Sequence, residues 1–248
     1  MRERPIIFSG PSVLAISRDL KTQSRRVVAL REFGASDTPG YDFTFRDRRM
    51  LWNDVSAARA LELCPYGRPG DKLWVREAWS SQEKDIVAYR ADGECGAWMG
   101  DGEGGRVWIN HGWIHGATDG TQPGKWYGLG KYGGRWRSPI FMPRWASRLT
   151  LELTGVRVER LNSISEDDAL AEGARYFPDA PEPRRHPYGI APPRWSMFSP
   201  ASTDECMHSA KMAFANGWDY VNGKRAPWAS NPWVWVLTFR RLHRGRLP

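Results

Sequence analysis

The run from Trp233 to Phe239 limits the possible folds most, because both of its faces would be apolar in a strand. Successive side chains of a strand point to opposite faces. Trp233, Trp235, Leu237 and Phe239 would therefore line one face, while two valines and a threonine line the other. A strand that is apolar on both faces must be covered on both. We therefore predict a central strand of a sheet near the C-terminus.

Other segments extend this prediction to a fold class. Alternating apolar and polar residues predict strands at 73–79 and 149–154, and helical periodicity predicts helices at 54–63, 165–173 and 203–216. Strands outnumber helices, and no strand–helix–strand rhythm appears. The pattern predicts an α+β, mainly β fold: an antiparallel barrel with added helices, spanning residues 1–248 as a single domain.

Two segments interrupt this pattern. Residues 93–137 are rich in glycine and have few periodic runs, so we predict a long insertion. Residues 177–200 hold seven prolines, which predicts a surface excursion. Residues 31–53 look irregular, and the charged run 46–49 within them is interpreted as a solvated loop. The acids of 165–173 are explained by the first turn of a helix that Ser165 caps, so we expect no catalytic role for them.

The composition narrows the possible partners. The formal charge of +8 and the pI of about 9.6 favour polyanions, and 14 tryptophans could also stack on bases. The three cysteines form no paired motif, and the His111–His115 pair lies among glycines, so no metal site is predicted. No targeting signal or long apolar run appears. We expect a cytoplasmic protein, located in the host cytoplasm if it is phage-encoded, that is monomeric and needs no membrane and no cofactor.

The segment from Lys21 to Arg26 gathers cations and hydroxyls at short spacing, directly after a predicted helix at 10–17. Residues 19–26 resemble the signature of the ASCH family, roughly Gly-x-Lys-Thr-x-[Thr/Glu]-x-Arg, with Asp19 in place of the glycine. The runs Gly70–Trp79 and Asn231–Phe239 also match. The chain looks like the phage and prophage members of this family. The match covers both ends of the chain well and its middle poorly.

The resemblance implies a PUA-like β-barrel that binds RNA, because ASCH domains are similar to the PUA domain. Some small bacterial members hydrolyse the acetyl amide of N4-acetylcytidine, using lysine, threonine and glutamate at the matching places. Lys21 would then be the base, Ser24 the nucleophile or oxyanion donor, and Glu77 the orienting acid or proton shuttle. Thr22 and Arg26 would shape the pocket. Glu77 also interrupts an apolar strand face, where a structural ion pair with Arg25 or Arg26 is the alternative.

The residues from Thr121 to Arg148 include six cations and no acid, with aromatic side chains between them. Cations for phosphates and aromatic faces for bases are what single-strand binding requires, although the same aromatics could simply pack the insertion. Together with the ASCH-like segment and the turn after the last helix, this predicts contacts to RNA, single-stranded nucleic acid or a modified nucleoside from Thr22, Arg25, Arg26, Arg76, Lys131, Arg135, Trp136, Arg137, Arg144, Trp145, Lys224 and Arg225.

Three functions therefore remain open from the sequence. The first is a metal-independent amidohydrolase acting on N4-acylated cytidine-type substrates. The second is a binding module for RNA or modified DNA without catalysis, in which Lys21, Arg25 and Arg26 contact phosphates. The third is a ribonuclease that uses Lys21 and an arginine, although no histidine pair stands at an obvious place for acid and base.

Overall fold

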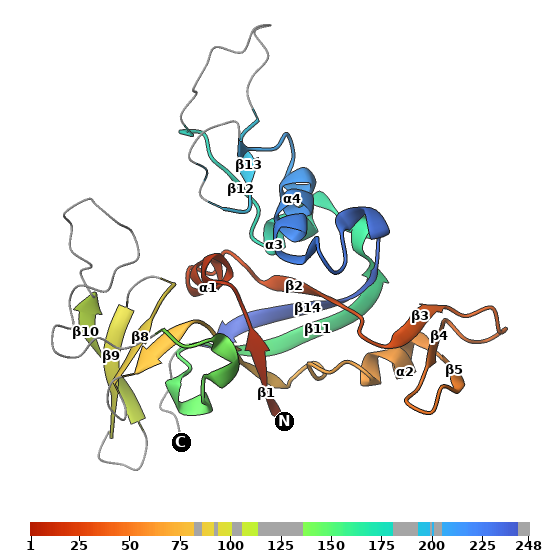
Figure 1. Ribbon diagram of the computed structural model, residues 1–248, viewed down its shortest axis with the longest axis horizontal. Coiled ribbons are helices and arrows are strands. Elements are labelled where there is room, and N and C mark those ends of the chain that lie inside the picture. The colour runs from red at the N-terminus through yellow and green to blue at the C-terminus, as the bar shows by residue number, and fades with distance from the viewer. Residues whose placement is uncertain are drawn as a thin grey trace, which may run out of the picture. The chain divides into compact units, whose positions relative to one another are not determined.

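The computed structural model describes residues 1–81, 86–91, 94–100, 106–113, 136–180, 193–198, 200 and 205–242 (Figure 1). The chain divides into two compact units. Unit 1 holds Met1–Arg18, Asp71–Glu152 and Arg241–Pro248, and unit 2 holds Asp19–Gly70 and Leu153–Arg240. Each unit is described by itself below.

Unit 1 contains a parallel pair of strands, β1 (Glu3–Ile7) and β6 (Lys72–Arg76), and β6 also pairs antiparallel with the start of β11 (Thr150–Arg160). Helix α1 (Gly10–Ser17) has a proline in its first turn, where the missing N–H costs no hydrogen bond. The apolar side chains of these elements form a buried core that includes Ile6, Val13, Ile16, Leu73, Val75 and Leu151.

A second sheet of unit 1 has the strand order β10-β9-β8-β7. These strands are β7 (Trp79–Ser81), β8 (Ile86–Tyr89), β9 (Glu94–Gly100) and β10 (Arg106–Trp113), and all neighbours are antiparallel. Two short 3-10 helices, η2 (Pro139–Phe141) and η3 (Arg144–Ala146), follow. The described part of the predicted insertion thus holds two strands, β9 and β10, whose backbones are hydrogen-bonded to each other. The glycines of this segment removed the apolar alternation that would have predicted them.

In unit 2, β14 (Trp233–Leu242) lies between β11 and β2 (Gln23–Val27) in the strand order. The prediction of a central strand at 233–239 is therefore confirmed. Helix α3 (Glu166–Ala171) begins at the Ser165 cap as predicted, and α4 (Ala210–Asn222) has Ser209 as its cap. On the face of β14 that carries Val234 and Val236, these two helices complete a buried apolar cluster.

The opposite face of β14 carries the tryptophans. Trp233 and Trp235 contact Phe33, and Trp233 contacts Phe43, with ring centroids 5.3 to 6.3 Å apart. These phenylalanines come from a three-stranded sheet of β3 (Arg31–Ala35), β4 (Phe43–Arg46) and β5 (Trp52–Val55). The interpretation of residues 31–53 as irregular was therefore wrong. Polar residues conceal these strands, which are stabilised by aromatic partners distant in sequence.

The remaining elements of unit 2 are short. Helix α2 (Ala57–Glu62) is capped by Ser56, two residues after the predicted cap Asp54. The others are η4 (Leu161–Ser163), β12 (Arg175–Tyr176), β13 (Trp195–Ser196) and η6 (Trp228–Ser230). Residues 181–192 of the predicted proline-rich excursion lie outside the described residues.

The protein is thus a strand-rich mixture of helices and strands, as predicted, with four α-helices in the described residues. The described strands form open sheets. Within the same ranges, no helix has the length and apolar character needed to cross a membrane.

Candidate functional site

The segment that leads to Lys21 turns at Asp19, which has a φ of 57°. This left-handed conformation favours glycine, and aspartate is among the few other residues that adopt it readily. Asp19 stands where the ASCH signature has its glycine, so the backbone has a conformation that the signature residue would also accept. The next contact ties the chain to α3, because the Thr22 N–H donates to the Ala171 carbonyl at 2.9 Å.

The Lys21 ammonium lies at the C-terminal end of α3. Its Nζ donates to Glu172 Oε2 at 2.6 Å and to the Glu172 backbone carbonyl at 2.7 Å. The last carbonyls of a helix lack partners within it and carry partial negative charge, so a cation is stabilised there. Lys21 is only 6% exposed and Glu172 only 3%. Lys21 is therefore a buried amine held by two acceptors of one residue.

Arg25 extends this pair into a larger charge cluster. Its Nη2 donates to Glu159 Oε1 at 2.6 Å and to Asp168 Oδ2 at 2.8 Å, and its Nη1 reaches Glu172 Oε1 at 3.3 Å. Arg157 joins through Asp168 Oδ2 at 2.7 Å. The charge cluster is hereafter Lys21, Arg25, Arg157, Glu159, Asp168 and Glu172.

These contacts leave the Arg25 guanidinium fully buried, and the Phe214 ring of α4 lies 5.7 Å from its Cζ. In this conformation Arg25 binds carboxylates of its own unit, which occupy the guanidinium that the predicted phosphate contact would need.

Burial lowers the pKa of the Lys21 ammonium, and the charge and hydrogen bond of Glu172 raise it by less. The positive charges of Arg26 and Arg25 add to the lowering. Loss of water disfavours the charged form of an amine, whereas a nearby carboxylate favours it. The Lys21 amine is therefore easier to deprotonate than an exposed lysine, which is the property a general base needs.

Desolvation tends to raise the pKa of Asp168, but hydrogen bonds from Arg25, Arg157 and Gln23 outweigh it and bring the pKa below its usual 3.8. A carboxylate with a lowered pKa stabilises the folded state above its unfolded pKa, and this stability is lost as the pH falls through the folded value.

We therefore expect Asp168→Asn to cost about 1.5–3 kcal/mol at neutral pH, the usual contribution of a hydrogen bond to a charged group. The difference from the parent should begin to shrink below pH 3.8, where the carboxylate of the unfolded chain takes up a proton, and should disappear as the pH falls through the lower pKa of the folded state. Urea unfolding at several pH values measures both. A difference that stays constant down to the acid limit would contradict the role of this carboxylate.

Ser24 lies in β2 next to this site. Side chains alternate along a strand, so Ser24 and Arg26 point to one face of β2 while Gln23 and Arg25 point to the other. Ser24 is 4% exposed and pairs with Leu237 in the sheet register. Among the described residues, no hydrogen bond joins the Ser24 hydroxyl to the Lys21 amine. The chain bends before Lys21, at Asp19, and β2 has begun by Gln23.

Glu77 belongs to unit 1 and forms a buried ion pair there. Arg148 Nε donates to Glu77 Oε1 at 2.8 Å and Arg148 Nη2 to Oε2 at 2.9 Å, a two-pronged contact. Glu77 is 1% exposed, and the Arg148 Cζ lies 4.2 Å from the centre of the Tyr89 ring. The sequence alternative of a structural ion pair named Arg25 or Arg26 as the partner, whereas the ion pair forms with Arg148. Lys21 and Ser24 belong to unit 2, so their convergence with Glu77 stays a prediction.

Three of the other predicted contacts in unit 1 form cation–aromatic pairs: Arg76, Arg137 and Arg144. The Trp74 ring lies 4.6 Å from the Arg76 Cζ and 6.0 Å from the Arg144 Cζ. The Trp79 ring lies 5.2 Å from the Arg137 Cζ and meets Trp145 edge to face at 6.2 Å. These pairs bring cations and aromatic rings together within the protein, and contact with nucleic acid stays a prediction. Trp136 is half-buried, and Lys131 and Arg135 lie outside the described residues.

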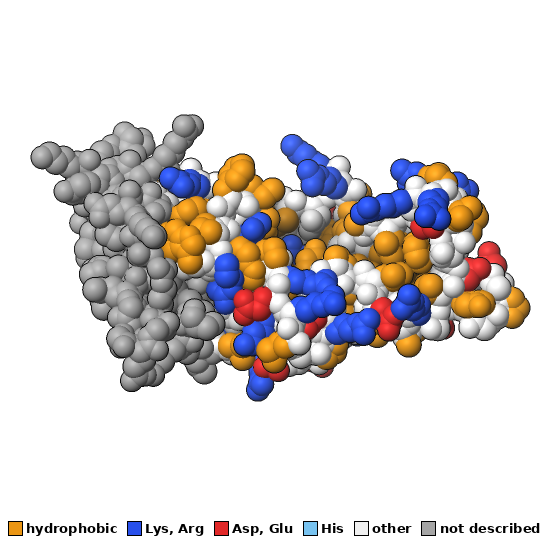
Figure 2. Space-filling model, turned by 90° about the horizontal axis from the view of Figure 1, so that it is seen from below, with side chains coloured by type: hydrophobic (Ala, Val, Ile, Leu, Met, Phe, Trp, Pro, Cys, Tyr) orange, Lys and Arg blue, Asp and Glu red, His pale blue; other side chains and the backbone are white. Residues whose placement is uncertain are grey.

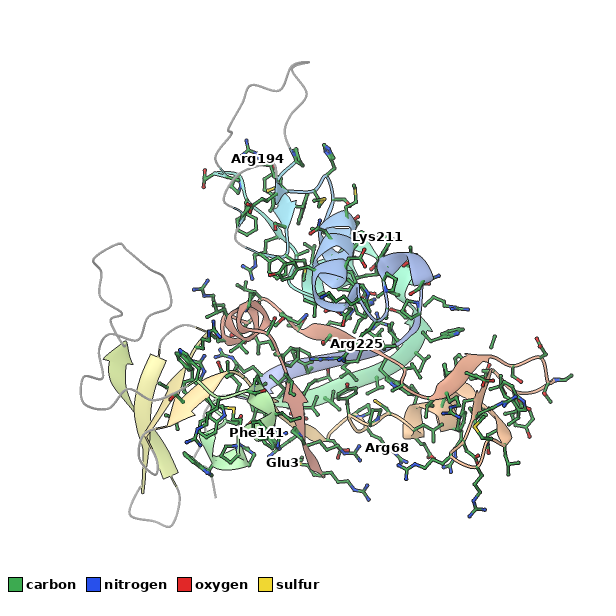
Figure 3. All side chains as sticks on the ribbon, viewed as in Figure 1. Glu3, Arg68, Phe141, Arg194, Lys211 and Arg225 are labelled. Atoms are coloured by element: carbon green, nitrogen blue, oxygen red, sulfur yellow. The ribbon has the colours of Figure 1, made fainter. Side chains whose placement is uncertain are left out.

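In unit 2, Thr22 is exposed and Arg26 is half-buried. Burial lowers the pKa of Arg26, opposed by Tyr66 and Glu172. Lys224 and Arg225 are exposed just after α4, and Figure 3 labels Arg225. On the face drawn in Figure 2, Lys and Arg side chains lie beside hydrophobic ones, and Asp and Glu are fewer.

Sequence reasoning missed the carboxylates that Lys21 and Arg25 bind. Asp168 and Glu172 were explained as ordinary acids of a capped helix, and Arg157 and Glu159 were not singled out. One signal was available: Glu172 stands at the C-terminal end of the predicted helix, where an acid is unfavourable unless a cation neutralises it.

The described residues contain no group of three or more His, Cys, Asp or Glu side chains that could hold a metal ion. No protein-family model, curated protein or solved structure matches this chain.

Proposed function

We propose that the protein is a hydrolase of N4-acylated cytidine-type nucleosides, free or within RNA, in which Lys21 transfers the proton. The observation that supports this most is the buried Lys21 amine, whose pKa is lowered and which lies against the Glu172 carboxylate. The resemblance of residues 19–26 and 70–79 to the ASCH signature supplies the substrate class. The same resemblance carries the proposal of a PUA-like barrel.

Amide hydrolysis needs a base at the start and an acid at the end. The nucleophile must lose a proton as it adds to the acyl carbonyl, and the departing N4 nitrogen must gain one. A neutral Lys21 would take the first proton and its ammonium would return it. Glu172 would hold the ammonium in place between the two steps, through the 2.6 Å contact.

The nucleophile in this proposal is water. Ser24 and Arg25 point to opposite faces of β2, and Arg25 shares Glu172 with Lys21. This geometry disfavours direct proton transfer from the Ser24 hydroxyl to Lys21. Ser24→Ala should then keep most of the turnover, whereas loss of turnover in that variant would restore Ser24 as the nucleophile.

The decisive experiment incubates the protein with N4-acetylcytidine and longer N4-acyl analogues, as free nucleosides and within short RNA strands. Mass spectrometry should detect cytidine and the free carboxylic acid. The proposal is wrong if none of the acyl analogues is hydrolysed. Shortened RNA strands would instead indicate the ribonuclease that the sequence left open.

A non-catalytic nucleic-acid-binding module is the second candidate, and the balance of the charge cluster favours it. Three cations and three carboxylates satisfy one another there, as in a purely structural network. A protein that binds RNA in a strongly salt-dependent way but turns over none of the acylated nucleosides would establish this candidate.

A further inference from the structure

The turn between β4 and β5 is an ordered hairpin. Arg46 pairs with Trp52 in the register, and residues 46–52 are called the hairpin tip here. Asp47 fixes its shape, because its Oδ1 accepts from the backbone N–H groups of Arg49 at 2.8 Å and Leu51 at 3.0 Å. Asp47 also closes the turn through its backbone, donating to the Leu51 carbonyl and accepting from Met50. Its carboxylate is therefore engaged within the turn.

This turn holds three consecutive large apolar side chains toward solvent. Met50, Leu51 and Trp52 are 42%, 59% and 54% exposed. Met50 has a φ of 64°, a left-handed conformation that costs a side-chain-bearing residue roughly 1–2 kcal/mol. The chain thus holds an unfavourable conformation at the point where it exposes apolar surface. Exposed apolar surface on a rigid support is typical of a binding site.

One arginine stacks on the exposed tryptophan, and others lie in the same turn and in the neighbouring strand. The Arg46 Cζ lies 4.6 Å from the centre of the Trp52 ring, and Arg46 also pairs with Glu32. Arg48 and Arg49 are exposed. Arg31 of the neighbouring strand pairs with Arg46 in the register and contacts the Met50 sulfur. Because the Asp47 carboxylate is bound by the turn, the tip presents cations and an indole together.

We propose that the hairpin tip docks single-stranded nucleic acid. A base would stack on Trp52, extending the guanidinium–indole pair that Arg46 begins, while Arg48 and Arg49 neutralise neighbouring phosphates. The inference goes beyond the hydrolysis proposed above, because a strand can bind at the tip whether or not its bases are acylated.

Charge complementarity alone would also fit an anionic lipid surface. Membrane-bound segments normally bury the apolar face of a whole amphipathic helix, whereas this tip offers three side chains, one of which already stacks on a guanidinium. A nucleobase is also planar, so it can stack on an indole in the way that the guanidinium does. Vesicles are therefore an arm of the test.

The test is fluorescence anisotropy of labelled short RNA and DNA single strands with the full chain, over a range of salt. Trp52→Ala should weaken binding about 5- to 100-fold, since a stacked base contributes about 1–3 kcal/mol. Trp52→Phe should retain most of the affinity. Arg48→Gln with Arg49→Gln should weaken binding and flatten its salt dependence by about 1.4 in log–log slope, for two phosphate contacts.

A matched control removes two other exposed arginines of unit 2. Arg59 and Arg68 have side chains 65% and 63% exposed, and both pair with Glu62; Figure 3 labels Arg68. Arg59→Gln with Arg68→Gln should bind nearly as the parent does. Met50→Gly separates an effect on folding from an effect on binding. Glycine adopts the left-handed φ readily, so the thermal stability should stay the same or rise, while the affinity for single strands should fall because the apolar side chain is lost.

Three results would overturn the inference. The first is that the parent protein binds no single strand at low salt. The proposed hydrolysis is tested separately by the acyl-cytidine assay, so the two proposals can fail independently. The second is equal affinity of the parent, Trp52→Ala and the double glutamine variant of Arg48 and Arg49. The third is binding to vesicles of phosphatidylserine and phosphatidylcholine that Trp52→Ala abolishes, with single strands unaffected by the same change.

Discussion

Lys21→Arg should leave the protein folded and reduce turnover of N4-acetylcytidine by about two to four orders of magnitude, the usual contribution of a positioned base. Arginine keeps the positive charge and can still bind Glu172, but it does not release its proton at any useful pH. Lysine can, and burial makes the Lys21 amine more acidic than an exposed one. The measurement is the rate of deacetylation at saturating substrate.

The pH dependence of the deacetylation rate tests the role of Lys21 independently. Because only the neutral amine accepts a proton, the parent rate should rise with pH through the lowered pKa of Lys21 and then level off below 10.5. The residual rate of Lys21→Arg should lack this step. Lys72→Arg makes the same exchange at a half-buried lysine of β6, outside every predicted contact, and should leave the rate unchanged. Equal rates for the parent and Lys21→Arg would end the assignment of Lys21 as base.

Arg148→Met should strongly destabilise the protein. It removes the two-pronged partner of Glu77, a carboxylate only 1% exposed. Breaking a buried ion pair from one side costs about 3–5 kcal/mol, because the other charge is left in the interior. Denaturant unfolding of the parent and the variant measures the loss.

Two further variants show whether loss of this buried ion pair causes that destabilisation. Changing Glu77→Leu together with Arg148→Met removes both charges, and should recover part of the stability. Arg144→Met breaks an arginine–glutamate pair that is partly exposed, 30% and 43%, and should cost less than about 1 kcal/mol. Equal losses for Arg148→Met and Arg144→Met would refute the importance of burial at Glu77.

The periodicity of apolar residues predicted those parts of the fold that the local sequence determines. The apolar alternation at 233–239 predicted the central strand β14, and Ser165 with its following acids predicted α3. Periodicity failed at β3, β4 and β5, whose strands are polar in sequence. There Phe33 and Phe43 find their aromatic partner, Trp233, almost 200 residues away in the chain.

The candidate site divides in the same way. Lys21 was singled out from its own segment, because a short motif marks it. Its carboxylate partner was not, since Glu172 lies 151 residues along the chain. A helix-terminal acid looks ordinary until the backbone brings a buried amine to it. Long-range pairing of charges leaves almost no trace in one sequence, because either member alone resembles a solvated surface residue.

The balanced charge cluster has a consequence for how the protein responds to its surroundings. Its three cations and three carboxylates cancel, so the net charge of +8 resides elsewhere in the chain. Dissolved ions screen exposed charges over about 8 Å at physiological ionic strength, but act much less on buried ones. Concentrated salt should therefore strip polyanions from the exterior, while the buried contacts of Lys21 and Arg25 with Glu172 persist. Acid should do the reverse, because protonation of the carboxylates opens the charge cluster while the exterior becomes still more cationic.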